Sequence, residues 1–354
     1  MRNFKNVPRV LFGRGCFQQV DGIIAAQRTA SVSPMAVYLV DDVFNGRGVL
    51  PVELPHGPDD LVQWVSVASE PKTDYVDQVT AEVRRRCGGL PAAVAGIGGG
   101  STLDITKAVS IMLTNPGRSH NYQGWDLPQK PPVFKVGIPT LSGTGAEVSR
   151  TCVLTGQQQK MGINSDYSVF DQIILDPNMV AGAPNPQRFF TGMDCYIHSV
   201  EALRGGFKNA FGQAFAEKAL DLCKRVFLQE GSDDDLMTAS YLGGCSVLYS
   251  ETGVCHALSY GLSLVLGYRH GEGNCLIFNH LDDFYPEDVA IFRDMVRSNH
   301  IELPRGVTRN LTGEQMRRMV AMTLRMEKPL TNALGTGWRN VMTEERIREL
   351  YCRL

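Results

Sequence analysis

The segment GVCHALSYGLSLVLGYRHG (253–271) is largely apolar, yet it carries three side chains that can bind metals or move protons. His256 stands near its start, His270 near its end, and Tyr260 one helical turn after the first histidine. Histidines in apolar surroundings are usually hydrogen-bonded core residues, so this explanation stays open. The two histidines also suit a metal site, provided that the segment folds back or ends beside further ligands.

A carboxylate and an imidazole stand four residues apart in TGMDCYIHSVEAL, as Asp194 and His198. On a helix they share one face, and a hydrogen-bonded surface pair would give the same spacing. With His256 and His270 they make a set of one oxygen and three nitrogen ligands. Such a set suits Zn²⁺ or Fe²⁺ and is too rich in nitrogen for Mg²⁺ or Ca²⁺. The spacing alone fits both a metal site and the hydrogen-bonded alternative.

The stretch GIGGGSTLDITKA (96–108) follows an apolar run and begins a helical pattern. Glycines let backbone N–H groups close on a phosphate, and the helix dipole favours an anion there. The fingerprint GxGxxG is not matched, so a tight strand-to-helix turn explains the same glycines. Two other apolar runs also end in polar residues, VDD (40–42) and PTLSGTGAE (139–147). Because the carboxyl ends of parallel strands meet at one sheet edge, a dinucleotide becomes the favoured ligand.

The first half of the chain alternates apolar runs with helical patterns. Apolar runs at 35–44, 92–101 and 134–143 have the length and continuity of parallel strands that are buried on both faces. Helical patterns lie between them, at 74–87 and 101–113. This alternation predicts a doubly wound α/β dinucleotide-binding domain.

From about residue 185 onward the pattern is helical and rich in alanine, leucine and small residues. The stretch DPNMVAGAPNP (176–186) holds three prolines and is typical of a link between domains. A chain of 354 residues is also longer than one hydrophobic core usually serves. We predict an α/β NAD-binding domain over 1–182 and an all-α metal-binding domain over 183–354.

The composition argues for a globular protein with a small-molecule ligand. Hydrophobic residues make up 43% and charged residues 20%, and the formal net charge is −2 without a Lys/Arg run. Nucleic acid and anionic membranes are therefore poor partners. No stretch approaches the length of a membrane span, and the start lacks a secretory pattern. Nine scattered cysteines without a CxxC pair favour a reducing cytoplasm over a disulfide framework.

Five ordered motifs resemble the iron-dependent (group III) alcohol dehydrogenases. They are GIGGGSTLDITKA, IPTLSGTGAEVS, the DP at 176–177, GMDCYIHSVEAL and HALSYGLSLVLGYRHG, within a resemblance that spans about residues 5 to 285. The resemblance implies the dehydroquinate synthase-like fold of that family and an NAD-dependent oxidoreductase acting on an alcohol group. The family's metal ligands fall on Asp194, His198, His256 and His270. Its cofactor contacts fall on Asp42, Gly99, Gly100, Ser101, Asp104, Thr140, Thr144 and Lys160.

Two positions depart from the family pattern. Most members have a second histidine one turn after the first, used in proton relay, where this chain has Tyr260. Tyr260 is therefore the candidate for the relay, although an ordinary tyrosine pKa near 10 makes it a poor free base. Glu70 stands in SEP, where Asn-Pro is usual. It is expected to accept from an adenosine hydroxyl and to repel a 2′-phosphate, which favours NAD over NADP.

Four further stretches resemble a branch of the family that oxidises the terminal carbinol of an acidic sugar of lipopolysaccharide. They are NFKNVPRVLFGRG, NYQGWDL, NSDYSVFDQIILDP and FNHLDDFYPE. This implies a sugar-acid substrate, zinc favoured over iron, and functional coupling to a PLP-dependent aminotransferase that takes up the aldehyde. A substrate carboxylate needs an Arg or Lys, for which Arg150, Arg204 and Arg269 are equal candidates.

Two other functions stay open. One is another group III dehydrogenase that acts on glycerol, lactaldehyde or a simple alcohol. The other is a non-catalytic NAD- or metal-binding protein, against which the four intact ligand positions count. A lyase of the dehydroquinate synthase type shares the fold plan but not the ligand pattern. A homodimer is the default assembly, and residues 286–354 suggest no function.

Overall fold

The computed structural model describes residues 5–29, 33–45, 53–156 and 160–354. The chain divides into two compact units, the first of Met1–Ser142 and Ala146–Ala183 and the second of Gly143–Gly145 and Pro184–Leu354. The junction at Ala183 lies beside the predicted division after residue 182. The short segment Gly143–Gly145, however, groups with the helices, although its sequence position is within the predicted α/β domain.

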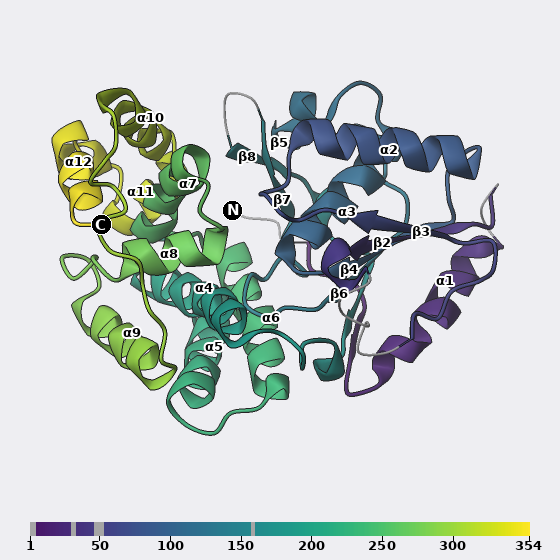
Figure 1. Ribbon diagram of the computed structural model, residues 1–354, viewed down its shortest axis with the longest axis horizontal. Helices are drawn as coiled ribbons and strands as arrows, with labels where there is room; N and C mark the ends of the chain where they lie inside the picture. Colours follow the sequence, from purple (N-terminus) through teal and green to yellow (C-terminus); the bar gives the residue numbers. More distant parts are fainter. Residues whose placement is uncertain (1–4, 30–32, 46–52, 157–159) are drawn as a thin grey trace. The chain divides into compact units, whose positions relative to one another are not determined.

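The first unit contains a parallel sheet in the order β1-β9-β6-β4-β2-β3 within the described residues (Figure 1). Its strands are β1 (Val10–Phe12), β2 (Ala36–Asp41), β3 (Leu61–Val65), β4 (Ala93–Gly98), β6 (Lys135–Pro139) and β9 (Gln172–Leu175). A second sheet, β5-β8-β7, consists of β5 (Gly124–Trp125), β7 (Thr151–Thr155) and β8 (Lys160–Asn164), with β7 and β8 antiparallel. The sequence did not predict this second sheet.

Helices cover both faces of the parallel sheet, as the continuous apolar runs predict. In β2, Val37 and Leu39 pack in one buried cluster with residues of α2 (Thr73–Cys87) and α3 (Gly100–Thr114). Tyr38 and Val40 face the opposite way and pack with residues of α1 (Val20–Arg28). Because successive side chains of a strand alternate between faces, a strand buried on both sides must be apolar throughout.

The chain order reverses beside β2, which pairs with β3 on one side and with β4 on the other. Register places Val40 opposite Ile97, and Gly98 opposite Pro139, so β2, β4 and β6 end at one edge of the sheet. Open α/β sheets bind their ligands outside the carboxyl ends of strands at such a reversal. The predicted nucleotide motifs thus follow strands that end at one edge.

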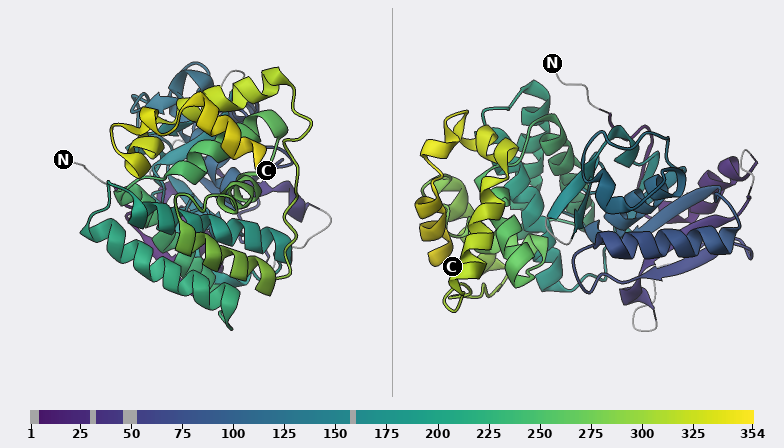
Figure 2. Two further views of the ribbon diagram at one scale, coloured as in Figure 1. Left: turned by 90° about the vertical axis from the view of Figure 1, so that its left-hand side faces the viewer. Right: turned by 90° about the horizontal axis from the view of Figure 1, so that it is seen from above.

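The second unit is helical. Its helices are α4 (Asn185–Arg204), α5 (Ala210–Leu228), α6 (Asp233–Tyr249), α7 (Val254–Leu266), α8 (His270–Phe278), α9 (Pro286–Ser298), α10 (Gly313–Leu324), α11 (Glu327–Leu334) and α12 (Glu344–Cys352). Helix α5 packs beside α4 and α6, and α10 packs beside α7 and α12 (Figures 1 and 2). One large core, with Phe189, Tyr196, Phe278 and Trp338 among its members, holds these helices together.

Short 3₁₀ helices complete the described structure, at Cys16–Gln19, Asp42–Phe44, Ser119–Tyr122, Asp166–Ser168, Pro177–Met179 and Trp338–Asn340. Among the described residues, no helix is both long and apolar enough to cross a membrane. The predicted fold class, an α/β domain followed by an all-α domain, is confirmed.

Candidate metal centre and nucleotide site

Three helices of the second unit bring together the four predicted metal ligands. Asp194 and His198 lie one turn apart on α4, His256 is in the first turn of α7, and His270 begins α8. One ligand atom from each residue lies within 4.8 Å of the others. Asp194 Oδ1 is central, because it lies 3.2 Å from Nε2 of His256, 3.5 Å from Nε2 of His270 and 3.6 Å from Nε2 of His198.

A glycine turn between α7 and α8 explains how two histidines of one apolar segment meet. Gly267 ends α7 with a positive φ of 74°, and its N–H donates to the Ser263 carbonyl. This left-handed cap is a common helix end because glycine adopts it without steric cost. Two residues, Tyr268 and Arg269, follow this cap, and His270 starts the next helix. The rings of His256 and His270 lie 5.2 Å apart between their centroids.

The electrostatics of the cluster favour a bound cation. Burial alone would raise the pKa of Asp194, but the three imidazoles beside it hold that pKa well below its usual range. Burial lowers the pKa of His198 to about 4. Burial also opposes the charge of His256, yet Glu201 and Asp194 outweigh it and raise the pKa of His256 to about 10. Two buried carboxylates therefore stabilise positive charge at this point.

Three buried polar atoms of the cluster have no hydrogen-bond partner in the described chain: Asp194 Oδ2, His198 Nδ1 and Asn274 Oδ1. Buried carboxylate oxygens are rarely left without a partner, because their desolvation is costly. A metal ion would satisfy Asp194 and is suited by one oxygen and three nitrogen donors. The residues present therefore fit a divalent cation such as Zn²⁺ or Fe²⁺. His270 exposes 27% of its side chain, so a small molecule can approach from that side.

Sequence reasoning missed two residues that hold the ligands in place. Glu201 Oε2 lies 2.6 Å from Nδ1 of His256, and Glu201 Oε1 accepts the backbone N–H of Cys255 at 2.6 Å. Asn274 Nδ2 donates to Asp194 Oδ1 at 2.7 Å. The signal for both was present in the spacing, because Glu201 follows His198 by three residues and Asn274 follows His270 by four.

Tyr260 lies beside the cluster. It follows His256 by one turn of α7, and its ring stands edge-on to His270 with 6.0 Å between the ring centroids. The side chain is partly buried. The structure thus brings Tyr260, the predicted relay residue, next to the predicted metal ligands.

In the first unit, the glycine-rich motif forms the turn from β4 to α3. A Cβ on Gly98 would lie 2.5 Å from Thr102 Cβ, and one on Gly96 would lie 2.3 Å from Thr106 Oγ1. These two glycines therefore let the helix pack directly on the strand. Gly99 precedes α3, and among the described residues no side chain caps this helix, so its first N–H groups are open to an anion.

The neighbouring strand ends lie close to this turn. Thr140 N–H donates to the Gly98 carbonyl at 2.9 Å, and Thr102 Oγ1 lies 3.5 Å from Asp41 Oδ2. Asp41 is buried and also accepts the N–H of Val43. Asp42, a predicted cofactor contact, is exposed at the start of a 3₁₀ helix. Its buried neighbour fixes the turn and leaves the Asp42 carboxylate accessible.

Two further predicted nucleotide residues contact each other. Lys160 Nζ lies 2.7 Å from Glu70 Oε2, and Lys160 is almost fully buried. Asp104, in the second turn of α3, accepts the N–H of Val153 at 2.9 Å and lies 3.7 Å from Lys107 Nζ. Burial raises the pKa of Asp104 to about 6. Charge in this region is thus balanced between two acids and two lysines.

Gly100 and Ser101 lie in the first turn of α3, but Thr144 belongs to the helical unit. The Gly143 N–H donates to Ser240 Oγ at 2.7 Å, and a Cβ on Gly145 would lie 2.4 Å from Gly244 Cα. The segment that carries Thr144 is thus packed on α6. The other predicted NAD residues all lie in the first unit.

Family models match both units. The model described as iron-containing alcohol dehydrogenase matches residues 8–177, and the C-terminal model of the Fe-containing alcohol dehydrogenase family matches residues 189–328. The chain belongs to the iron-containing alcohol dehydrogenase family. Among solved structures of this fold, 1,3-propanediol oxidoreductase has a TM-score of 0.78 at 22% identity, covering 99% of each chain. The alcohol dehydrogenase from Oenococcus oeni has a TM-score of 0.80 at 17% identity, covering 99% of this chain and 100% of that one.

Relatives within the family are distant. The sulfoacetaldehyde reductase of Bilophila wadsworthia (strain 3_1_6) is 29% identical over 67% of this chain and 65% of its own length. The 1,3-propanediol dehydrogenase of Citrobacter freundii is 30% identical over 63% of this chain and 59% of its own length. The chain thus spans less than two thirds of the length of these two relatives.

Proposed function

We propose that this protein is an NAD- and metal-dependent dehydrogenase that oxidises the C8 primary alcohol of 3-deoxy-D-manno-octulosonate (Kdo) to an aldehyde. The buried cluster of Asp194, His198, His256 and His270, in a chain of this family, carries the assignment of an alcohol dehydrogenase. The choice of Kdo rests on the four stretches described above, which resemble Kdo 8-oxidase. The aldehyde would then pass to a PLP-dependent aminotransferase on the route to 8-amino-3,8-dideoxy-octulosonate.

The metal would be held by Asp194 and the three histidines, and we favour zinc, with iron as the alternative that the family name supports. When bound, the cation supplies Lewis-acid polarisation of the substrate hydroxyl, and NAD⁺ supplies the hydride acceptor. The overall reaction removes a hydride and a proton from the carbinol and gives NADH and the aldehyde.

The chain's own residues orient the ligands. Glu201 accepts from Nδ1 of His256, which fixes the tautomer that leaves the Nε2 lone pair for the metal that would be held beside Asp194. Asn274 donates to the same Asp194 oxygen that faces the histidines. The hydroxyl of Tyr260, beside His270, is our candidate for passing the alcohol proton toward solvent.

For NAD, we assign the pyrophosphate to the first turn of α3, at Gly99, Gly100 and Ser101. Asp42 and Glu70 are our assignments for ribose hydroxyls, and Asp104, Thr140, Thr144 and Lys160 complete the proposed cofactor set. Support for NAD over NADP comes from Glu70, whose carboxylate would repel a 2′-phosphate, although Lys160 at 2.7 Å partly offsets that charge.

Of the three arginine candidates for the substrate carboxylate, we favour Arg269. Arg150 is engaged by Asp126 and Asp166, and Arg204 by Asp288. Arg269 directly precedes His270 and is exposed. Within the described chain its guanidinium donates to Gln187 Oε1 at 3.4 Å and forms no ion pair with a carboxylate. Its guanidinium is therefore the most available to a carboxylate beside the cluster.

The second candidate function is oxidation of a short-chain alcohol or reduction of the corresponding aldehyde. The names of two relatives, sulfoacetaldehyde reductase and 1,3-propanediol dehydrogenase, favour this reading. The third, an inactive NAD- and metal-binding protein, is opposed by the complete ligand set.

The test is reconstitution. The protein is stripped of metal with a chelator, reloaded with Zn²⁺ or Fe²⁺, and supplied with NAD⁺ and with Kdo, glycerol or butanol while NADH absorbance is followed. We expect metal-dependent NADH formation with Kdo. Turnover of the simple alcohols alone would replace Kdo by the second candidate. Tight metal and NAD binding without any turnover would support the inactive protein.

A further inference from the structure

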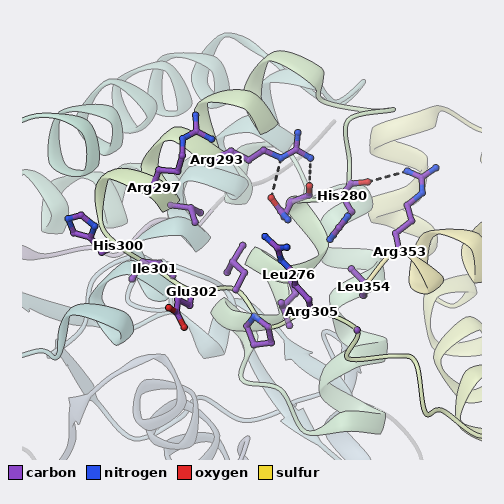
Figure 3. Close-up of a pocket in the computed structure, with 15 residues that line it drawn as sticks. Leu276, His280, Arg293, Arg297, His300, Ile301, Glu302, Arg305, Arg353 and Leu354 are labelled. Carbon is purple, nitrogen blue, oxygen red and sulfur yellow. Dashed lines mark hydrogen bonds between the residues drawn. The ribbon is translucent and has the colours of Figure 1, made fainter.

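A pocket away from the metal cluster lies within the helical unit. Its volume is about 1040 Å³, and it is lined by the end of α8, by α9, by the loop 300–306 and by the last two residues of the chain (Figure 3). The loop bends through positive φ at both ends, 53° at His300 and 67° at Gly306. None of its lining residues is a predicted metal or cofactor ligand. Its size matches the upper range of small-molecule sites.

The pocket is lined by more basic than acidic side chains. Four arginines line it, Arg293, Arg297, Arg305 and Arg353, together with His280 and His300, against the single acid Glu302. Figure 3 shows Arg293, Arg305 and Arg353 around His280. Burial lowers the pKa of His280, and these three arginines lower it further against the opposing charge of Asp282. Arg293, Arg305 and Arg353 thus lie close enough to His280 to act on its charge.

Most of these arginines already have acidic partners outside the lining. Arg293 is bound to Asp282, Arg297 to Asp294, and Arg353 to Asp283. Asp283 is shared with a second arginine, Arg346. Arg346 also pairs with Glu349. Arg293, Arg297, Arg346 and Arg353 therefore share four acidic partners, and their charge is matched.

Arg305 differs from the other arginines. It is exposed, it has no ion pair or side-chain hydrogen bond in the described chain, and it lies close enough to act on His280. An unpaired guanidinium at the wall of a concave site presents a planar set of donors that fits phosphate or carboxylate oxygens. Glu302, the one acidic lining residue, is exposed on the same loop.

Apart from Asn279 and Gly306, the remaining lining is apolar. Leu276, Val296, Ile301, Leu303, Pro304 and Leu354 contribute hydrocarbon to the walls. Ligand sites commonly combine an apolar lining with a few placed polar groups. A fully hydrated inorganic ion would leave this surface without a partner, whereas an organic anion would cover it.

We propose that this pocket is a second binding site, for a small organic anion whose phosphate or carboxylate contacts Arg305 and whose apolar part lies against Leu276, Val296 and Ile301. This site is separate from the proposed dehydrogenase chemistry, and its occupancy does not require turnover. Phosphate esters and carboxylates share the chemistry that Arg305 recognises, and the probes below distinguish them.

The test uses the full chain loaded with metal and saturated with NAD⁺, and Arg269→Ala is titrated in parallel so that anion binding at the proposed substrate position is recognised. Phenyl phosphate, phenylacetate and uncharged phenylacetamide, which has no hydroxyl to oxidise, are titrated by calorimetry. We expect binding of at least one of the two anions to both proteins, with phenylacetamide much weaker. Phenyl phosphate alone would identify a phosphate ester as ligand, and phenylacetate alone a carboxylate.

Arg305→Ala is expected to lower the affinity for the anion by about tenfold or more, because a charge-assisted hydrogen bond is lost. Arg305→Lys should restore part of the affinity. The matched control is Arg318→Ala, an exposed arginine of α10 outside the pocket, which should bind as the unaltered protein does. Absence of binding by both anions, or equal losses in Arg305→Ala and Arg318→Ala, would overturn the proposal.

Discussion

Oε2 of Glu201 lies 2.6 Å from Nδ1 of His256, and the other ring nitrogen of that histidine faces Asp194 at 3.2 Å. One imidazole is therefore held between two buried carboxylates. Glu201 uses its second oxygen to accept the N–H of Cys255, so it ties the histidine to the first turn of α7. This relationship separates two roles for acids in the site: Asp194 faces the metal position, and Glu201 positions a ligand.

Glu201→Gln should weaken Zn²⁺ binding by about ten- to a hundredfold, because the amide has one oxygen to serve two donors. The measurement is a competitive zinc titration against a chelating dye, with circular dichroism to verify folding. Glu217→Gln, an exposed acid of α5, is the control and should bind zinc normally. Unchanged zinc affinity in Glu201→Gln would show that the contact with His256 does not position the ligand.

Tyr260→Phe should lower kcat by about ten- to a hundredfold and leave KM and zinc content nearly unchanged, if the hydroxyl moves the alcohol proton. Tyr260→His places an imidazole at this position and should keep kcat, with a pH profile that shifts toward the imidazole pKa. These values come from initial rates with Kdo across a pH series. Full activity in Tyr260→Phe would remove Tyr260 from the proton path.

Arg269→Ala should raise KM for Kdo by about tenfold or more while rates with glycerol stay as they were, because only Kdo carries a carboxylate. Arg269→Lys keeps the charge and should recover part of the loss. Steady-state kinetics with both substrates provide the comparison. An equal effect on glycerol would mean that Arg269 acts on the cluster rather than on the substrate carboxylate.

Asp104→Asn should flatten part of the pH dependence of stability. Burial raises the folded-state pKa of Asp104 to about 6, above its ordinary value, so its contribution is favourable in acid and is lost as pH rises through about 6. The shift corresponds to at most about 3 kcal/mol. Thermal unfolding is measured at about pH 4 and about pH 8. The melting temperature of the variant, relative to that of the unaltered protein, should be higher at the higher pH.

The exposed Asp59 supplies the control for that comparison. Asp59→Asn should have the same melting temperature as the unaltered protein at both pH values. If the melting temperature of Asp104→Asn also matches that of the unaltered protein at both pH values, the Asp104 carboxyl is already ionised at low pH, and burial does not govern its titration.

The sequence predicted the parts of this molecule that follow local rules. Continuous apolar runs predicted the buried strands β2, β4 and β6, and the four-residue spacing of Asp194 and His198 predicted that they share a helix face. The prediction that those two residues meet His256 and His270 rested on the resemblance to the family as much as on spacing. Helix packing decides which faces meet, and no local pattern records it.

The break between α6 and α7 shows what local patterns miss. Residues 236–267 have a helical pattern throughout, yet the structure ends α6 at Tyr249 and starts α7 at Val254. Side chains distant in sequence make this break stable. Asn209 Nδ2 donates to the Tyr249 carbonyl, and Asn332 Nδ2 donates to the carbonyls of Glu251 and Thr252. These bonds satisfy carbonyl groups that a continued helix would have paired.

Because the segment Gly143–Gly145 belongs to the helical unit, a single cut in the chain cannot separate the two units. The chain enters the helical unit at Gly143, leaves it after Gly145 and returns at Pro184. A fragment starting at Pro184 would lack the N–H of Gly143 that pairs with Ser240 and the backbone that packs against Gly244. Swapping helical domains between relatives at the 183–184 junction would therefore transplant an incomplete core, and a working chimaera would need residues 143–145 from the same parent as its helices.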